Sequence, residues 1–345
     1  MTERRWTMRP MTADDFDAVR ALYASVRDVG RPEEHDRWRL LDNPVAFPPA
    51  ILAMDGERCA GLYLLWPVRL QLGSEVVLGA QSVDTMTHPD YRNQGMFTAL
   101  AERCFALAAE RGFQALYGFP NPLSYPGFVR KLDWDHTGDI PQWIRVIRPS
   151  GLARLPRALG PLADACARLL PGSVPAGIEV VAGPPSPEIL TGFLGEWRSR
   201  KGLARISRDD DWLAWRYDSR SRMEYEWLVA YRGGVPVACG AWGMRGTDWG
   251  TLADGRAKLM ETLGNDPDGL RAVVATAIDR AAAKGAWMIE TMTNLEPVTA
   301  ILRRFGFISH RKAPFIVRRL VVRSLGANVH SHGNWRIVGG DVDTF

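Results

Sequence analysis

One ten-residue segment, HPDYRNQGMF, holds the residues of this chain best suited to bind an anion. It runs from His88 to Phe97, and apolar residues recur at helical spacing from Gln94 to Arg111, which predicts a helix starting here. The start of a helix presents unpaired backbone N–H groups and the positive end of its dipole. Gly95 leaves that backbone accessible, and Arg92 adds a fixed positive charge. The segment therefore predicts a pyrophosphate site, although a glycine that only turns the chain is the alternative interpretation.

The chain as a whole has the composition of an ordinary folded protein. Of its 345 residues 46% are hydrophobic and 24% charged, and this length favours two domains of roughly 150 residues each. Its net charge of +4 comes from dispersed basic residues, so we expect no nucleic-acid partner, whereas an anionic small ligand fits. No apolar run approaches the roughly 20 residues that span a bilayer, so we expect no membrane partner.

The N-terminus and the cysteines indicate where the protein works. The first residues, MTERRWTMRPMTADDF, contain no apolar stretch typical of a secretory signal, which predicts a cytoplasmic location. No two cysteines form a CxxC pair, and their apolar neighbours favour reduced, buried thiols over disulfides or a metal site; they are Cys59, Cys104, Cys166 and Cys239.

The second half of the chain repeats the first. RGFQALYGFPN followed by FVRKLDW corresponds to KGAWMIETMTN followed by LRRFGF, and three landmark pairs lie at one constant offset: Gly112 and Gly285, Asn121 and Asn294, Trp134 and Phe307. We infer two copies of one α/β unit. We predict a first domain over residues 1–150, a connection rich in Pro, Gly and Ala over 151–188, a second copy over 189–322 and a tail over 323–345.

The strand, corner and helix in VDTMTHPDYRNQGMFTAL resemble the acyl-CoA-binding segment of the GNAT superfamily of N-acyltransferases. The resemblance extends over residues 7–148, and the second half looks like a degenerate second copy. It implies an α/β (α+β) fold of two tandem GNAT-like domains, each a mixed, mostly antiparallel sheet with splayed central strands flanked by helices. Two positions depart from the family pattern: Phe97 stands where Gly or Ala is commoner, and Val129 where many members carry a tyrosine proposed as general acid.

The resemblance also implies a cosubstrate, acetyl-CoA or another acyl-CoA, and the residues that would hold it. The strand edge at Thr85, Met86 and Thr87 would pair with the pantetheine arm. Asn121 would contact the same arm, or would simply be a turn residue in FPNP. The pyrophosphate would lie in a cradle of backbone N–H groups from Arg92, Asn93, Gln94, Gly95, Met96 and Phe97.

Direct acyl transfer needs a neutral amine, a donor to the developing oxyanion and a proton for the departing thiolate. A backbone N–H near Thr85 would serve the oxyanion. Asp84 is the candidate general base, because burial in an apolar strand would raise its pKa; a structural role is the alternative, since strand alternation points it away unless a bulge intervenes. The position that the family most often uses for a base falls on Gln81. Tyr125 is the candidate acid or a wall of the pocket, and His88 is expected to be an exposed corner residue.

In the second copy, the segment NDPDGL, Asn265 to Leu270, takes the place of RNQGMF. Its two aspartates, Asp266 and Asp268, would repel a pyrophosphate, so we predict that this copy keeps the fold without binding CoA. An aromatic cluster upstream could line an acceptor pocket, or could be a helix that buries its aromatic face; its residues are Trp212, Trp215, Arg216 and Tyr217.

The tail NWRIVGGDVDTF is similar to the ends of bacterial acyltransferases that act in surface-polysaccharide and nucleotide-sugar pathways. The sequence thus predicts an N-acetyltransferase or other N-acyltransferase that acts on a small-molecule primary amine, with a nucleotide-linked amino sugar as the favoured acceptor. An aminoglycoside, a polyamine or a peptide amine is the alternative acceptor. A non-catalytic acyl-CoA-binding module is the alternative function.

Overall fold

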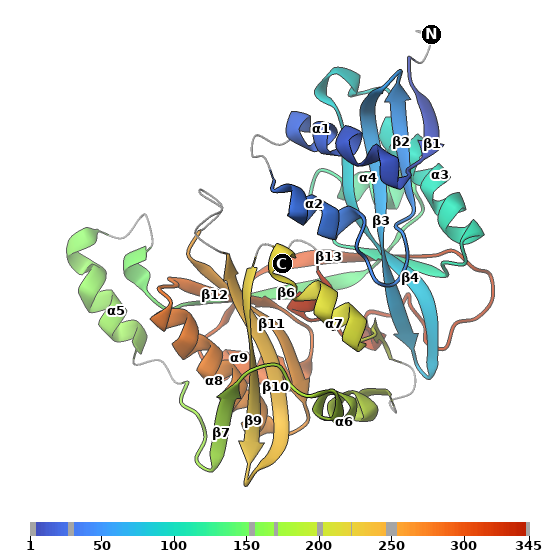
Figure 1. The fold of residues 1–345 in the computed structure, drawn as a ribbon. Helices are drawn as coiled ribbons and strands as arrows, with labels where there is room; N and C mark the ends of the chain where they lie inside the picture. Colours follow the sequence, from blue (N-terminus) through green and yellow to red (C-terminus); the bar gives the residue numbers. More distant parts are fainter. Residues whose placement is uncertain are drawn as a thin grey trace. The chain divides into compact units, whose positions relative to one another are not determined.

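The computed structural model describes residues 5–26, 31–151, 156–168, 172–198, 203–221, 223–245 and 254–342 (Figure 1). The chain divides into two compact units, each assembled from three segments. Unit 1 consists of Met1–Asp139, Lys201–Arg216 and Pro314–Trp335; unit 2 consists of Ile140–Arg200, Tyr217–Ala313 and Arg336–Phe345. Among the described residues, no helix combines the length and apolar character needed to cross a bilayer.

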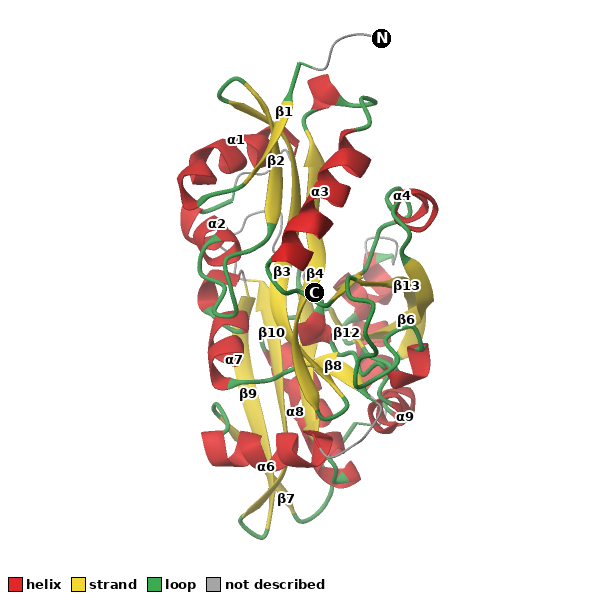
Figure 2. Cartoon of the chain, turned by 90° about the vertical axis from the view of Figure 1, so that its right-hand side faces the viewer, coloured by secondary structure: helices red, strands yellow, loops and turns green. Residues whose placement is uncertain are grey.

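Unit 1 is a twisted sheet with helices on both faces. Its strands follow the order β1 (Thr7–Pro10), β2 (Ala50–Asp55), β3 (Arg58–Leu72), β4 (Glu75–Thr87), β5 (Ala115–Gly118) and the C-terminal part of β13 (Ile308–Arg319), and β8 (Ala204–Ile206) pairs with the end of β3. Every pairing is antiparallel except that of β4 with β5. Helices α1 (Phe16–Val26) and α2 (Glu33–Leu40) cover one face and α3 (Met96–Glu110) covers the other (Figure 2). Two shorter helices, α4 (Tyr125–Lys131) and α7 (Asp210–Arg216), complete the unit.

Unit 2 repeats this arrangement. Its strand order is β7 (Ile178–Ala182), β9 (Met223–Arg232), β10 (Val235–Arg245), β11 (Arg256–Gly264), β12 (Met288–Met292) and β6 (Asp135–Val146), and again one pair, β11 with β12, is parallel. Its helices are α5 (Gly160–Arg168), α6 (Pro187–Arg198), α8 (Pro267–Ala283) and α9 (Glu296–Arg304). The core lies between the sheet and helices α8 and α9.

The repeat inferred from the sequence matches the order of elements in the two copies. Gly112 and Gly285 end α3 and α8 with the same left-handed backbone, φ 83° and 89°. The last strands, β6 and β13, are each 12 residues long and begin directly after Trp134 and Phe307. The predicted fold class, a mixed and mostly antiparallel sheet in each copy with flanking helices, is confirmed.

The boundaries predicted from the sequence differ from those of the structure, because each copy gives its last strand to the other unit. From Ile140 onward β6 belongs to unit 2, where it pairs with β12, and from Pro314 onward β13 belongs to unit 1, where it pairs with β5. The segment predicted as a tail is therefore part of the fold. Its Trp335 is fully buried in unit 1 and packs against Tyr117 and Phe315.

The aromatic cluster of α7 is core rather than a pocket wall. The Trp215 ring stacks on Trp38 with the centroids 5.0 Å apart, and each indole N–H donates to the other residue's carbonyl, at 2.7 and 3.1 Å. Trp212 and Arg216 are buried as well. Tyr217 lies in unit 2, where its hydroxyl donates to Glu261 at 2.7 Å. One cysteine also departs from expectation: Cys166 is exposed, while the other three are buried.

This exchange of strands predicts that residues 1–150 do not fold alone. Without Pro314–Trp335 the β5 edge is unpaired and Tyr117 loses its contacts with Phe315 and Trp335, so the fragment should aggregate or show no cooperative thermal transition in circular dichroism. Co-expression with peptides 201–216 and 314–335, the other two segments of unit 1, should restore a soluble complex. A stable, monomeric 1–150 fragment with a sharp transition would contradict this assembly.

Candidate active site

The two central strands of unit 1 part after a short stretch of pairing. β4 and β5 pair in parallel at three positions, the last joining Gln81 to Tyr117. β4 then continues to Thr87 with its other edge still paired to β3, whereas β5 ends at Gly118. Among the described residues, the β5-facing edge of β4 has no strand partner beyond Gln81. The predicted pantetheine residues, Thr85, Met86 and Thr87, lie on this open edge.

The corner between β4 and α3 is a short 3₁₀ turn, Pro89–Tyr91, followed by an exposed loop. Two loop residues adopt the left-handed conformation, Asn93 with φ 63° and Gly95 with φ 72°. Gly95 is the N-cap residue of α3, and no side chain caps the helix. A Cβ at Gly95 would meet no protein atom within 4 Å, so the space in front of this backbone is open.

A row of backbone donors faces this open space. The first backbone hydrogen bond of α3 joins the Ala99 N–H to the Gly95 carbonyl at 3.3 Å. Among the described residues, none accepts from the N–H groups of residues 93–98. The loop itself is anchored, because Trp6 donates to the Gln94 side chain at 3.0 Å and Met96 is buried against Gly61. A fixed, uncapped helix start with an exposed Arg92 beside it fits a pyrophosphate, whose oxygens accept several hydrogen bonds.

Phe97 keeps its backbone in this row while its ring turns into the protein. The ring packs edge-on against Phe128 at 5.4 Å, and a Cβ added to Gly127 would come within 2.8 Å of it. Gly127 thus leaves room on α4 for a side chain larger than the family usually carries at this helix position. The departure noted in the sequence is explained by packing between α3 and α4.

Asp84 lies in a β-bulge. β3 pairs Leu62 with Met86 and Leu64 with Val83, so that Asp84 and Thr85 share the span opposite a single β3 residue, and Asp84 has φ 45°. The bulge that the sequence argument required is therefore present. It directs the Asp84 carboxylate into a buried ion pair with the Arg39 guanidinium of α2.

The expectation that burial gives Asp84 a raised pKa is wrong. Desolvation raises the pKa of Asp84, but the charge and hydrogen bond of Arg39 and the charge of Arg31 outweigh that effect and hold the pKa well below its ordinary value. A carboxylate so stabilised is a poor proton acceptor. The structure favours the alternative that Asp84 is a structural residue tying α2 to the bulge.

Gln81 is no base either, because a carboxamide does not take up a proton at neutral pH. Its buried amide oxygen accepts from the Tyr117 hydroxyl at 3.4 Å. His88 is committed to the corner rather than exposed. Its Nδ1 accepts from the Asp90 N–H at 3.2 Å, and its Nε2 lies 2.8 Å from the Arg58 guanidinium. These side chains shape the site without an evident role in proton transfer.

Tyr125 has a partner that the sequence argument missed. Its hydroxyl lies 3.0 Å from Nδ1 of His136, whose Nε2 lies 2.9 Å from the Gly138 carbonyl and 3.2 Å from the Asp139 carboxylate. A carbonyl oxygen only accepts, so Nε2 carries a proton, and Nδ1 of the neutral ring accepts from the tyrosine. This contact holds the hydroxyl of the half-buried Tyr125 in a fixed position. Val129, at the usual acid position, packs against the core.

Asn121 begins α4. Its side-chain oxygen accepts from the N–H groups of Leu123 and Ser124, both at 2.9 Å, which is the turn role that the sequence left open. Its contact with a pantetheine arm remains a prediction. Asn294, its counterpart in unit 2, accepts from the Ile337 N–H at 3.0 Å.

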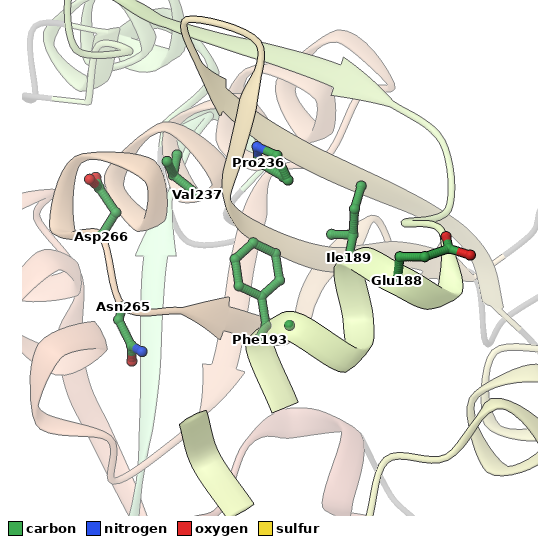
Figure 3. A pocket seen from close by; sticks show the side chains of 8 residues that line it. Glu188, Ile189, Phe193, Pro236, Val237, Asn265 and Asp266 are labelled. Carbon is green, nitrogen blue, oxygen red and sulfur yellow. The ribbon is translucent and has the colours of Figure 1, made fainter. Parts of the chain in front are cut away.

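The second corner is built differently. Only Asn265 and Asp266 separate β11 from α8, and the Asp266 carboxylate caps the helix by accepting from the Gly269 N–H at 2.7 Å. The adjoining cavity, of about 510 Å³, is lined by Asp266, Glu188 and apolar side chains such as Phe193 of α6 (Figure 3). A carboxylate thus takes the place where an anion would bind, which supports the prediction that unit 2 does not bind CoA.

Comparison with known proteins agrees with this geometry. Residues 7–137 match the family model of the acetyltransferase (GNAT) domain. That family generally uses acetyl-CoA as cosubstrate, and the match supports the GNAT superfamily for this segment. No curated protein sequence matches the chain.

Solved structures extend the likeness to both units. A tandem GNAT protein from the clavulanic acid biosynthesis pathway aligns over 92% of this chain and 100% of its own, with a TM-score of 0.61 and 15% identity. A GCN5-related N-acetyltransferase from Anabaena variabilis aligns over 92% of this chain and 73% of its own, with a TM-score of 0.64 and 10% identity. A putative acetyltransferase from Pyrococcus horikoshii aligns over 99% of this chain and 96% of its own, with a TM-score of 0.56 and 13% identity. The chain has the tandem GNAT fold.

The packing of Phe97 against α4 predicts a coupled pair of substitutions. Gly127→Ala should destabilise the protein by about 1–3 kcal/mol, because the new methyl group overpacks against the ring. In a Phe97→Ala background the same change should cost much less, giving a double-mutant coupling measurable by urea denaturation. Additive effects would show that the two positions do not pack as described.

The Asp84 ion pair predicts a pH-dependent stability. Removal of one partner, as in Arg39→Met, should cost about 3–5 kcal/mol because it leaves a buried unpaired charge. The folded pKa of Asp84 is depressed, so its contribution is complete above the unfolded pKa near 3.9 and declines as the pH falls below that value.

Urea denaturation between pH 2 and 6 checks this, with the Arg39→Met/Asp84→Leu double variant as control. The double variant should be more stable than Arg39→Met alone and should have a shallower decline in acid. Equal acid slopes in the wild type and the double variant would contradict the ion-pair account.

Proposed function

We propose that the protein is an acyl-CoA-dependent N-acyltransferase that transfers an acyl group, acetyl in the first instance, to a primary amine. Unit 1 supplies the acyl-CoA site and unit 2 does not bind CoA. The observation that carries the proposal is the anchored, uncapped start of α3, where Gly95 leaves a row of unpaired N–H groups open beside Arg92. The open edge of β4 and the match of residues 7–137 to the acetyltransferase domain model support it.

Two of the three chemical requirements of direct transfer, the oxyanion donor and the proton for the thiolate, then fall to defined groups. The bulge at Asp84 and Thr85 turns backbone away from regular pairing with β3, which suits an N–H donor to the developing oxyanion. Tyr125, positioned by its hydrogen bond to His136, donates its hydroxyl proton to the departing thiolate, and its phenolate is reprotonated from water, which takes up the proton that the attacking amine loses. Since Asp84 and Gln81 are unsuited to be bases, the amine reaches the thioester neutral or loses its proton through water.

For the acceptor we propose a small molecule, with a nucleotide-linked amino sugar favoured by the similarity of the C-terminal segment to nucleotide-sugar acyltransferases. The tandem GNAT protein of clavulanic acid biosynthesis is a precedent for this architecture in small-molecule metabolism. An aminoglycoside, a polyamine or a peptide amine is the alternative acceptor. Thiol release with an amine panel, followed by mass spectrometry of the product, distinguishes them. We place the reaction in the cytoplasm.

Substitution of Gly95 tests the cosubstrate site. Asparagine tolerates the left-handed conformation better than most residues, so Gly95→Asn should fold nearly as well as the wild type. Its side chain would project into the open space and should weaken CoA binding about tenfold or more, and the carboxylate of Gly95→Glu should weaken it further. Isothermal titration with acetyl-CoA measures both effects.

Asp268→Asn in unit 2 is the matched control for these variants, and its acetyl-CoA affinity should equal that of the wild type. If the intact protein did not bind acetyl-CoA, or if all variants bound it equally, the proposed site would be wrong.

A second candidate function, a non-catalytic acyl-CoA-binding module, has one observation in its favour. The Asp84 carboxylate and the Gln81 amide on β4 are both committed to internal partners. This alternative predicts acetyl-CoA binding without thiol release for any amine. If the Tyr125→Phe variant turned over more slowly than the wild type but kept its affinity for acetyl-CoA, the protein would be an enzyme.

A further inference from the structure

Unit 2 contains a second cavity, of about 670 Å³, on one face of its sheet. Arg256 and Lys258 alternate along β11 and point into it, whereas Ala257 and Leu259 between and after them belong to the core packed against α8. The cavity therefore lies on the sheet face opposite α8. Its volume is in the range of small-molecule sites.

Positive charge dominates the cavity wall. Arg245 and Arg256 share one carboxylate, Asp254, at 4.0 and 3.1 Å. Lys258 pairs with Glu290 at 3.5 Å. Arg311 also lines the cavity and makes no ion pair among the described residues. Among the described residues that line the cavity, four arginine and lysine side chains thus face two carboxylates.

Burial of the Lys258 side chain disfavours its charged form. The Lys258 side chain is only 9% exposed, and desolvation lowers its pKa although Glu290 acts in the opposite direction. A poorly solvated cation with neighbours of the same sign is stabilised by an added anion. The excess charge is therefore explained most simply by an anionic ligand.

Unit 1 provides an internal control for this argument. The parallel strands β11 and β12 of unit 2 correspond to β4 and β5 of unit 1. The pair Arg256–Met288 therefore corresponds to Gly79–Ala115. The pair Lys258–Glu290 corresponds to Gln81–Tyr117. That unit places neutral residues at these positions. There the same face is filled, because Tyr117 packs against Phe315 and Trp335 with ring centroids about 6 Å apart. The fold itself does not require a charged, open face at this position.

We propose that unit 2 binds, in this cavity, a small molecule that carries at least two negative charges as phosphate or carboxylate groups. Arg256 and Arg311 contact the anionic groups from the rim, and Lys258 supports them from the floor. The proposal does not depend on the function assigned to unit 1. It gives the second copy, whose own helix start is capped by Asp266, a ligand of a different kind from CoA.

Isothermal titration with inorganic pyrophosphate, and separately with citrate, tests the proposal. Both titrations use the full-length protein with Gly95→Glu, so that the corner of unit 1 does not compete for the probe. We expect one site per chain for at least one probe. The Arg256→Gln/Arg311→Gln double variant should lower the affinity about tenfold or more, because it removes two charges from the rim of the cavity.

Arg304→Gln, on the exposed surface of α9, is the control and should leave the affinity unchanged. Binding of pyrophosphate alone would identify a phosphate ligand, and binding of citrate alone a carboxylate ligand. If neither probe bound, or if the double variant bound both as tightly as the control did, the proposal would be overturned. Thermal melts of both variants confirm that they are folded.

Discussion

The start of α3 depends on one constraint: a helix whose first N–H groups serve a ligand must have no cap of its own and must still be rigid. Gly95 meets the first condition by its missing side chain and its left-handed backbone. Trp6 and the buried Met96 meet the second by holding the loop and the first turn. At α8 the chain takes the opposite course, since the Asp266 carboxylate satisfies the helix start directly. One fold thus contains an open and a closed version of the same corner.

The exchange of β6 and β13 between the two units supports the open edge of β4 in unit 1. β5 pairs with β4 at only three positions, so β5 depends on β13 along its other edge and on the aromatic packing around Tyr117. This support lets β4 extend beyond β5 with a free edge. The far C-terminal segment therefore stabilises a site whose residues all lie in the first half of the chain, and a two-domain division by sequence position misses that dependence.

The sequence was most informative where the signal is local. Helical spacing after Gln94 predicted α3, and the constant offset between Gly112 and Gly285 revealed the repeat, because periodicity and turn residues act over a few positions. The partners of Asp84 and Tyr125 escaped prediction for the converse reason. Arg39 lies 45 residues from Asp84, and His136 lies 11 residues after Tyr125, across the turn between α4 and β6. No local pattern encodes those contacts, and burial alone gave the wrong direction for the Asp84 pKa.

Hydrogen–deuterium exchange with and without CoA tests the central claim most directly, because it reports on the backbone N–H groups themselves. The account predicts that CoA slows the exchange of amides in residues 93–98 and leaves those in residues 266–270 unchanged. Protection at the start of α8, or none at the start of α3 under saturating CoA, would contradict it.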